Sequence, residues 1–171
     1  ITLGDPTAAA SLRLIRVLDE SGADIVELGI PYSDPLADGS TIQASHQRSL
    51  LEGMNTDRAL HLVEEAKSAT SKPLVLLIYY NLVLQRKVAQ FFRDAAAVGV
   101  SGVIVPDLPV EESHEALKAS ERYGIDLIYL VAPTTDNRRL LKILQVSRGF
   151  IYLVGLLGVT VANSVAMLGR W

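Results

Sequence analysis

The sequence predicts a single α/β domain built from alternating strands and helices. Short runs rich in β-branched residues alternate with longer segments of helical period, and turn residues separate them. The strand runs are apolar at nearly every position, which is typical of a parallel sheet buried on both faces. The 171 residues are 49% hydrophobic and 20% charged, so the chain can bury one sizeable core.

The predicted strands begin with a residual first strand, "IT", at Ile1 and Thr2. Five apolar runs follow it along the chain: "DIVEL", "PLVLLIYY", "SGVIVPD", "DLIYLVAP" and "GFIYLVG". Five intervening segments carry the period of an amphipathic helix. They are "SLRLIRVLDESG", "TDRALHLVEEAKSA", "KVAQFFRDAAAVG", "EESHEALKASERYG" and "DNRRLLKILQV". Thr56 and Thr135 precede or open two of these segments as N-cap candidates, and Gly22, Gly99 and Gly124 end three of them.

Two architectures fit these alternating units, an open doubly wound sheet and a closed (β/α)8 TIM barrel. A barrel collects polar groups at the ends of many strands, whereas an open sheet concentrates them at one switch point. Here nearly every predicted strand is followed by polar or glycine-rich residues: Asp5, Glu27, Asn81, Asp107, Thr134 and "GLLG". No complete dinucleotide or Walker motif supports the open sheet. The pattern therefore favours the barrel.

The chain is expected to be a partial barrel covering roughly strands one to six. Barrels of this kind run to about 250 residues, and the chain opens at Ile1 without a methionine, which suggests an N-terminal trim. Residues 159–171 contain no recognisable strand and helix pair, so we expect one incomplete domain, 1–171, with a divergent tail and without strands seven and eight. An unclosed sheet would expose unpaired edges at strands one and six.

Composition argues against several classes of function. The net charge is −3 and no basic cluster suggests nucleic-acid binding. The sequence contains no cysteine, which excludes disulfides, thiolate nucleophiles and thiolate metal sites. No apolar run reaches the roughly 18 residues that a membrane span needs. His46, His61 and His114 fall on helical segments without a second ligand at metal spacing, so we expect surface histidines and no metal site. No glycine-flanked serine nucleophile indicates a hydrolase.

The acidic residues have structural interpretations as well as catalytic ones. Glu27 ends an apolar strand, where burial would raise the pKa of a carboxyl, but a strand-terminal glutamate can also reach solvent. Asp34 is predicted to satisfy N–H groups of its own turn. Asp5 is expected to be a turn or cap residue. Asp107 is a loop acid that can face the site or a partner, and we expect a structural role for both residues.

The stretch "ELGIPYSDPLADGSTIQ", residues 27–43, resembles the signature of the tryptophan synthase alpha chain family. The resemblance extends through "ITLGDPT", "YYN", "VPDLPVEES" and "GFIYLVG" to about Thr160. It implies a TIM barrel that cleaves indole-3-glycerol phosphate to indole and glyceraldehyde 3-phosphate without a metal or organic cofactor. By the same resemblance, Glu27 is the general acid and base, and Asp38 accepts a hydrogen bond from the indole N–H.

The resemblance also implies supporting residues. Tyr79 and Tyr152 would line the indole pocket, although either tyrosine could be ordinary core. The family holds the substrate phosphate with backbone N–H groups of the loops after strands six, seven and eight, and Gly158 and Thr160 match the first of these loops. Val161 stands where the family has glycine, and a valine resists the backbone angles and close approach that glycine allows.

The family works with a beta subunit, which carries pyridoxal phosphate, in an α2β2 heterotetramer. The resemblance therefore implies a beta-subunit partner, no cofactor in this chain, and a cytoplasmic or, in a plant, plastid location. Two alternatives stay open. A stand-alone indole-releasing lyase would share these residues, and a catalytically inactive fragment or assembly module would retain the barrel segments alone.

Overall fold

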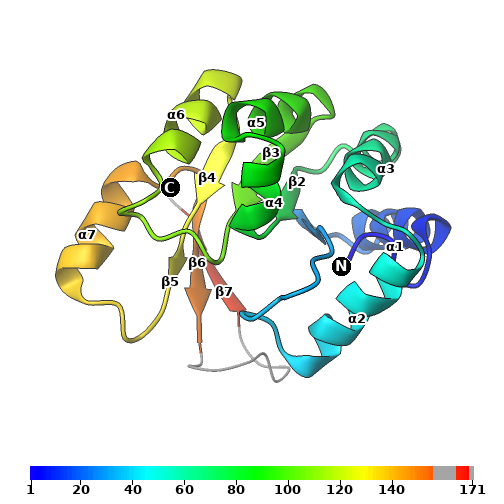
Figure 1. The fold of residues 1–171 in the computed structure, drawn as a ribbon, viewed down its shortest axis with the longest axis horizontal. Helices are drawn as coiled ribbons and strands as arrows, with labels where there is room; N and C mark the ends of the chain where they lie inside the picture. Colours follow the sequence, from blue (N-terminus) through cyan, green and yellow to red (C-terminus); the bar gives the residue numbers. More distant parts are fainter. Residues whose placement is uncertain (156–164, 170–171) are drawn as a thin grey trace.

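A computed structural model describes residues 1–155 and 165–169 of the chain. These described residues form seven helices: α1 (Ala8–Glu20), α2 (Ser40–Leu51), α3 (Thr56–Ala69), α4 (Tyr80–Gln85), α5 (Val88–Ala97), α6 (His114–Tyr123) and α7 (Asn137–Val146). The strands are β1 (Val26–Gly29), β2 (Leu74–Leu77), β3 (Val100–Ile104), β4 (Asp126–Ile128), β5 (Leu130–Val131), β6 (Phe150–Val154) and β7 (Val165–Gly169). Figure 1 shows the strands in the middle of the molecule with the helices arranged around them.

The strands from β1 to β6 are parallel and follow one another in chain order. β1, β2, β3 and β4 form one sheet, and β5 pairs with β6 in another. Tyr129 lies between β4 and β5, and its carbonyl accepts the N–H of Tyr152 at 3.0 Å, which connects the two sheets. Thr2 adds the predicted first strand through a parallel bridge to Gly29. This sequential order lacks the reversal of a doubly wound sheet and confirms the barrel-type arrangement.

The two faces of the sheet pack against different partners. On one face, strand residues such as Leu28 and Leu76 join side chains of the helices in a large core. On the other face, strand side chains pack on one another around Val75, Ile104 and Ile128, and Tyr152 packs against this group. Such strand-on-strand packing is how the interior of a barrel is filled. The strands are therefore covered on both faces, which explains why their sequences are apolar at nearly every position.

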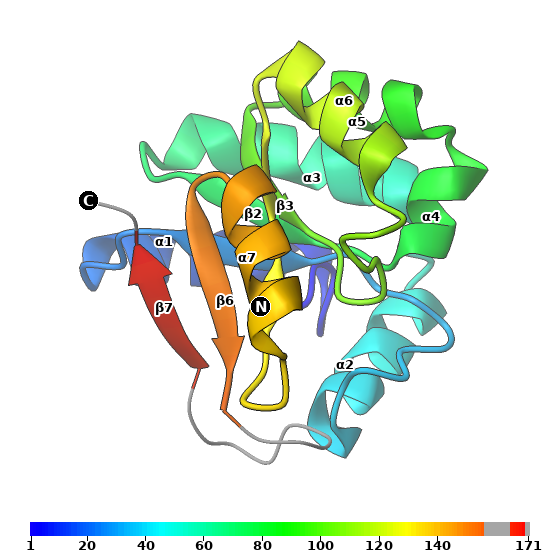
Figure 2. The same cartoon turned by 90° about the vertical axis from the view of Figure 1, so that its left-hand side faces the viewer.

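β7 departs from the sequence prediction. The tail was expected to add no further strand, but Val165–Gly169 pairs antiparallel with β6, from Val154↔Val165 to Phe150↔Gly169. Figure 2 shows the two strands side by side. A parallel crossover needs a dozen residues or more, and residues 155–164 are too few, so a strand at this distance can pair only antiparallel. The edge of β6 that was predicted to be free is therefore paired.

The C-terminal ends of the helices agree with the sequence prediction more closely than their N-terminal ends do. Gly99 and Gly124 have φ angles of 86° and 68°, as expected after α5 and α6. The N-caps are one residue away from the predicted threonines. Asn55 caps α3 by accepting the N–H of residue 58 at 3.0 Å, and Asp136 caps α7 by accepting the N–H of residue 139 at 2.9 Å. Amide and carboxylate oxygens are at least as effective as hydroxyls at this position.

Lys87, which precedes α5, has a backbone conformation that suits glycine. Its φ of 66° and ψ of 129° place Cβ in a sparsely populated region that costs about 1–3 kcal/mol. We expect Lys87→Gly to raise the free energy of unfolding by about 1 kcal/mol, after the entropic cost of glycine is subtracted. Urea unfolding monitored by circular dichroism measures the change. Lys87→Ala is the matched control, and equal stabilisation by both variants would attribute the effect to the lysine side chain instead.

Candidate active site

Glu27 was predicted to end its strand, but it lies inside β1, which continues to Gly29, and its backbone is in register with Val75 of β2. Because side chains alternate along a strand, Glu27 shares the interior face with Ile25, while Val26 and Leu28 face the helices. The Glu27 side chain is half-buried. Burial raises the pKa of its carboxyl above the ordinary value of 4.5, and the charge of Asp38 acts in the same direction. Such a carboxyl can carry a proton closer to neutral pH.

Asp38 lies on the loop between β1 and α2, and Tyr79 holds it there. The Tyr79 hydroxyl donates to Asp38 Oδ2 at 2.8 Å and accepts the backbone N–H of Ala37 at 3.0 Å. Burial, followed by the hydrogen bond to Asp38, raises the pKa of Tyr79 well above its usual range. Tyr79 therefore remains a neutral hydrogen-bond donor at physiological pH, and Asp38 is oriented by it.

His46 does not lie on the surface as predicted. Only 2% of its surface is exposed, because α2 turns the polar residues Ser45, His46 and Ser49 inward. The Nδ1 atom of His46 accepts the backbone N–H of Tyr32 at 2.8 Å, and its Nε2 lies 3.4 Å from Asp38 Oδ2. His61, by contrast, is 71% exposed, in agreement with the prediction. His114 is exposed as well.

Tyr152 lies on β6 and packs against the interior group around Val75, Ile104 and Ile128. Burial, followed by the charges of Glu27 and Asp38, raises the pKa of the Tyr152 hydroxyl to about 12. These three residues come from separate parts of the chain: Glu27 from β1, Asp38 from the loop that follows it, and Tyr152 from β6. Tyr32 stacks on Tyr79 with ring centroids 5.0 Å apart and extends the aromatic lining of the site. Gly158 and Thr160 lie outside the described residues.

The remaining acidic residues have structural contacts. Asp5 accepts two hydrogen bonds from the guanidinium of Arg48, at 2.7 and 2.8 Å. Asp107 accepts the backbone N–H of Tyr80 at 2.8 Å, near the start of α4. Both residues therefore have structural contacts, as predicted, although Asp5 pairs with Arg48 and it is Thr7 that caps α1. The Asp34 side chain accepts a hydrogen bond from the Ser33 hydroxyl at 2.5 Å, whereas the sequence predicted that it would accept backbone N–H groups of its turn.

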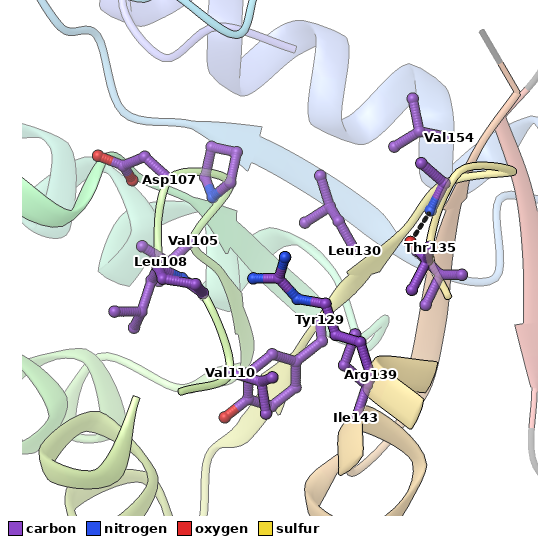
Figure 3. Close-up of a pocket in the computed structure, with 14 residues that line it drawn as sticks. Val105, Asp107, Leu108, Val110, Tyr129, Leu130, Thr135, Arg139, Ile143 and Val154 are labelled. Carbon is purple, nitrogen blue, oxygen red and sulfur yellow. Dashed lines mark hydrogen bonds between the residues drawn. The ribbon is translucent and has the colours of Figure 1, made fainter. Parts of the chain in front are cut away.

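A cavity of about 440 Å³ lies near the C-terminal ends of β3, β5 and β6 (Figure 3). Its lining is mostly apolar and includes Val105, Leu130 and Val154. Figure 3 shows Arg139, to which no sequence motif pointed, reaching toward the cavity from α7. Arg139 also donates to Glu111 at 3.0 Å, so its charge is balanced. This end of the strands is where barrel enzymes place their active sites.

The arrangement suits proton transfer combined with charge stabilisation. Glu27 is a half-buried carboxyl whose pKa is raised, whereas Asp38 is fixed by the hydroxyl of Tyr79. Different surroundings give two carboxyl groups different roles, one as an acid and base and one as an acceptor. Within residues 1–155, no group of three or more His, Cys, Asp or Glu side chains could hold a metal ion. No helix in that part is both long and apolar enough to cross a membrane.

The raised pKa of Glu27 predicts how stability depends on pH. The folded chain retains a proton on Glu27 that the unfolded chain releases, so stability falls as the pH rises from about 4.5 through the raised pKa. Glu27→Gln removes this titration. The free energy of unfolding of this variant, relative to that of the parent, should therefore rise between about pH 4.5 and the raised pKa of Glu27 and then level off. The rise is about 1.4 kcal/mol for each pH unit by which folding raises that pKa. Urea unfolding between pH 4 and pH 8 tests this, and a flat difference would contradict it. Glu20→Gln, at an exposed position of α1, is the control.

Comparison with known proteins identifies relatives over nearly the whole chain. The family model described as tryptophan synthase alpha chain matches residues 1–168. The tryptophan synthase alpha chain of Methanothermobacter thermautotrophicus is 48% identical over 164 residues, which cover 96% of this chain and 61% of the relative. That of Picosynechococcus is 45% identical, with coverage of 96% and 62%. The chain therefore spans less than two thirds of the length of these relatives.

Solved structures show the same similarity in three dimensions. A tryptophan synthase structure from Mycobacterium tuberculosis gives a TM-score of 0.90 at 41% identity and covers 96% of this chain and 63% of that chain. A structure of the tryptophan synthase α2β2 complex from Pyrococcus furiosus gives a TM-score of 0.88 at 42% identity. It covers 92% of this chain and 64% of that chain.

Proposed function

Because this chain belongs to the tryptophan synthase alpha chain family, we propose that it acts in tryptophan biosynthesis as an indole-3-glycerol-phosphate lyase. The observation that carries the proposal is the hydrogen bond of 2.8 Å by which Tyr79 orients Asp38, on the loop that follows the strand of Glu27. Tyr152, on β6, packs on the interior face of the strands, and the charges of Glu27 and Asp38 contribute to the raised pKa of its hydroxyl.

In the proposed reaction, Glu27 handles both protons. Its protonated carboxyl delivers a proton to indole C3, which leaves positive charge on the ring nitrogen. The bond between C3 and the side chain then breaks, and the side-chain hydroxyl gives up its proton as it becomes the aldehyde of glyceraldehyde 3-phosphate. Glu27 accepts that proton and is ready for the next cycle. Asp38 accepts the indole N–H and stabilises the positive charge, while Tyr79 and Tyr152 line the indole pocket.

The partner and cofactor follow from the same family. We propose that the chain binds a tryptophan synthase beta subunit in an α2β2 assembly, the form in which the Pyrococcus furiosus relative was solved. Pyridoxal phosphate would belong to that partner, because the proposed cleavage needs acid–base and electrostatic groups only. A cytoplasmic location, or a plastid in a plant, suits such a biosynthetic enzyme.

A second candidate is an inactive module that retains affinity for the partner. It is favoured by β7, which runs antiparallel along the edge of β6 where a closed parallel barrel would place its next strand. Such a module would bind the beta subunit without releasing indole.

Indole formation from indole-3-glycerol phosphate separates the two candidates. The purified protein is assayed alone and with a beta subunit. A second form joins residues 1–155 to the remaining C-terminal part of the Methanothermobacter thermautotrophicus alpha chain. Indole release by either form, abolished by Glu27→Gln, supports the lyase. Partner binding without indole from either form would reject the lyase and support the module.

A further inference from the structure

His46 is a buried titratable side chain for which the proposed chemistry has no role. It lies on the inward face of α2 between two buried serines that already have partners. Ser45 shares a hydrogen bond of 2.6 Å with Thr2, and Ser49 donates to the carbonyl of Leu3 at 2.6 Å. His46 instead faces the loop that carries Asp38, and it contacts that loop at both of its ring nitrogens.

The contact with Tyr32 determines the tautomer of His46. The backbone N–H of Tyr32 points at Nδ1 over 2.8 Å, and a backbone N–H can only donate. Nδ1 must therefore present its lone pair, and the proton of the neutral imidazole lies on Nε2. A doubly protonated ring would set two N–H groups against each other at this short distance. The hydrogen-bond network thus assigns a neutral His46 with a proton on Nε2.

The Nε2–H group then faces Asp38. Nε2 lies 3.4 Å from Oδ2, which is longer than an ordinary hydrogen bond, so the contact is an electrostatic one between the N–H dipole and the carboxylate. Tyr79 donates to the same oxygen at 2.8 Å. Two donors from separate elements, α2 and the end of β2, therefore meet on Oδ2. None of the described residues donates a hydrogen bond to the other carboxylate oxygen, Oδ1, so this oxygen can accept one from a ligand.

We propose that His46 is a positioning residue, which holds the Asp38 carboxylate, together with Tyr79, as a rigid acceptor for the N–H of an aromatic ligand. A fixed carboxylate pays no orientational cost when the ligand arrives, and so it discriminates between a ligand with an N–H and an isostere without one. This inference rests on the proposed function, because that function supplies the indole N–H.

The first experiment reads the tautomer and does not require activity. Long-range ¹H–¹⁵N correlation spectra of the uniformly ¹⁵N-labelled protein distinguish a protonated from an unprotonated ring nitrogen, and His46→Gln assigns the signals. We expect an unprotonated Nδ1 and a protonated Nε2 for His46, with the Nε2–H signal shifted by Asp38→Asn. A ring protonated on Nδ1, or no response to Asp38→Asn, would overturn the inference. His61 is the exposed control and should show fast exchange between tautomers.

The second experiment measures the discrimination itself. Indole and benzofuran have the same shape, but benzofuran has an oxygen in place of the N–H. We expect the parent protein to bind indole about tenfold more tightly than benzofuran. His46→Leu should lose most of this ratio, whereas His46→Gln, whose amide N–H reaches about as far as Nε2, should keep it. His61→Leu should leave the ratio unchanged. Circular dichroism confirms that each variant is folded.

The outcomes separate this inference from the proposed function. If the parent discriminates and His46→Leu discriminates equally well, the positioning role is wrong while Asp38 keeps its role. If the parent shows no preference for indole, the assignment of the N–H to Asp38 fails, and the positioning role falls with it. The spectra in that case still report whether the proton lies on Nε2. The proposal is supported if His46→Leu loses the preference for indole over benzofuran and His46→Gln keeps it. A purely structural role would instead lower the affinity for both ligands alike.

Discussion

Glu27→Gln is expected to lower the turnover number for indole formation by about 10³-fold, within the range found for removal of a general acid–base group. Glutamine matches glutamate in shape but can neither deliver a proton to indole C3 nor accept one from the side-chain hydroxyl. The Michaelis constant should change little, because the proton transfers occur in the transition state and not in the bound substrate. The measurement is steady-state kinetics of indole release, made with whichever of the two forms described above releases indole.

Two further variants define this result. Glu27→Asp keeps the carboxyl group but shortens the side chain by one methylene. This misplacement of the acid should lower the turnover number by about 10²-fold. Glu20→Gln alters an exposed glutamate of α1 and should leave the turnover number unchanged. If Glu27→Gln retained most of the activity, another group would have to carry the protons, and the mechanism proposed for this site would be wrong.

Asp38→Asn is expected to lower the turnover number by about 10²-fold or more, the cost of removing one electrostatic group that stabilises a transition state. The amide preserves the volume of the side chain, but it is neutral and cannot offset the charge that develops on the indole nitrogen. The asparagine amide can also turn so that its NH2 group faces the Tyr79 hydroxyl. In that orientation it cannot accept the hydrogen bond that Tyr79 donates to Asp38. The effect should appear in the turnover number more than in the Michaelis constant.

Asp34→Asn is the matched control, because it removes a carboxylate from the same loop at a position whose only side-chain hydrogen bond among the described residues is to Ser33. Steady-state kinetics of both variants make the comparison. Equal losses in the two would indicate that the loop as a whole tolerates no substitution, and the specific role of Asp38 would then be unsupported.

The parts of the fold that depend on local patterns could be predicted from the sequence. Strands buried on both faces have continuous apolar runs, and helices that end in a left-handed residue carry glycine at that place, as Gly99 and Gly124 do. The sequential parallel order was favoured by the polar residues that follow nearly every strand. β7 was missed because its pairing depends on the length of the preceding segment and not on a pattern of its own.

The candidate site was only partly predictable. The family resemblance singled out Glu27 and Asp38, which the structure places on β1 and on the loop that follows it, but nothing in the sequence pattern pointed to His46. The reason is the inverted polarity of α2, which buries a histidine and two serines while it exposes Leu51 to 80%. A helix that packs polar groups against a functional loop violates the amphipathic rule on which sequence interpretation depends.

The antiparallel pairing of β7 has a consequence for the order of folding. Val26 of β1 pairs with Leu74, and Leu74 pairs with Val100, so each parallel pairing must close a long loop. Val154 and Val165 are separated by a much shorter stretch of chain. Because the entropic cost of closure grows with loop length and local contacts form faster, β6 and β7 are expected to pair early. Any parallel partner for the edge of β6 would then arrive at a position that is already occupied.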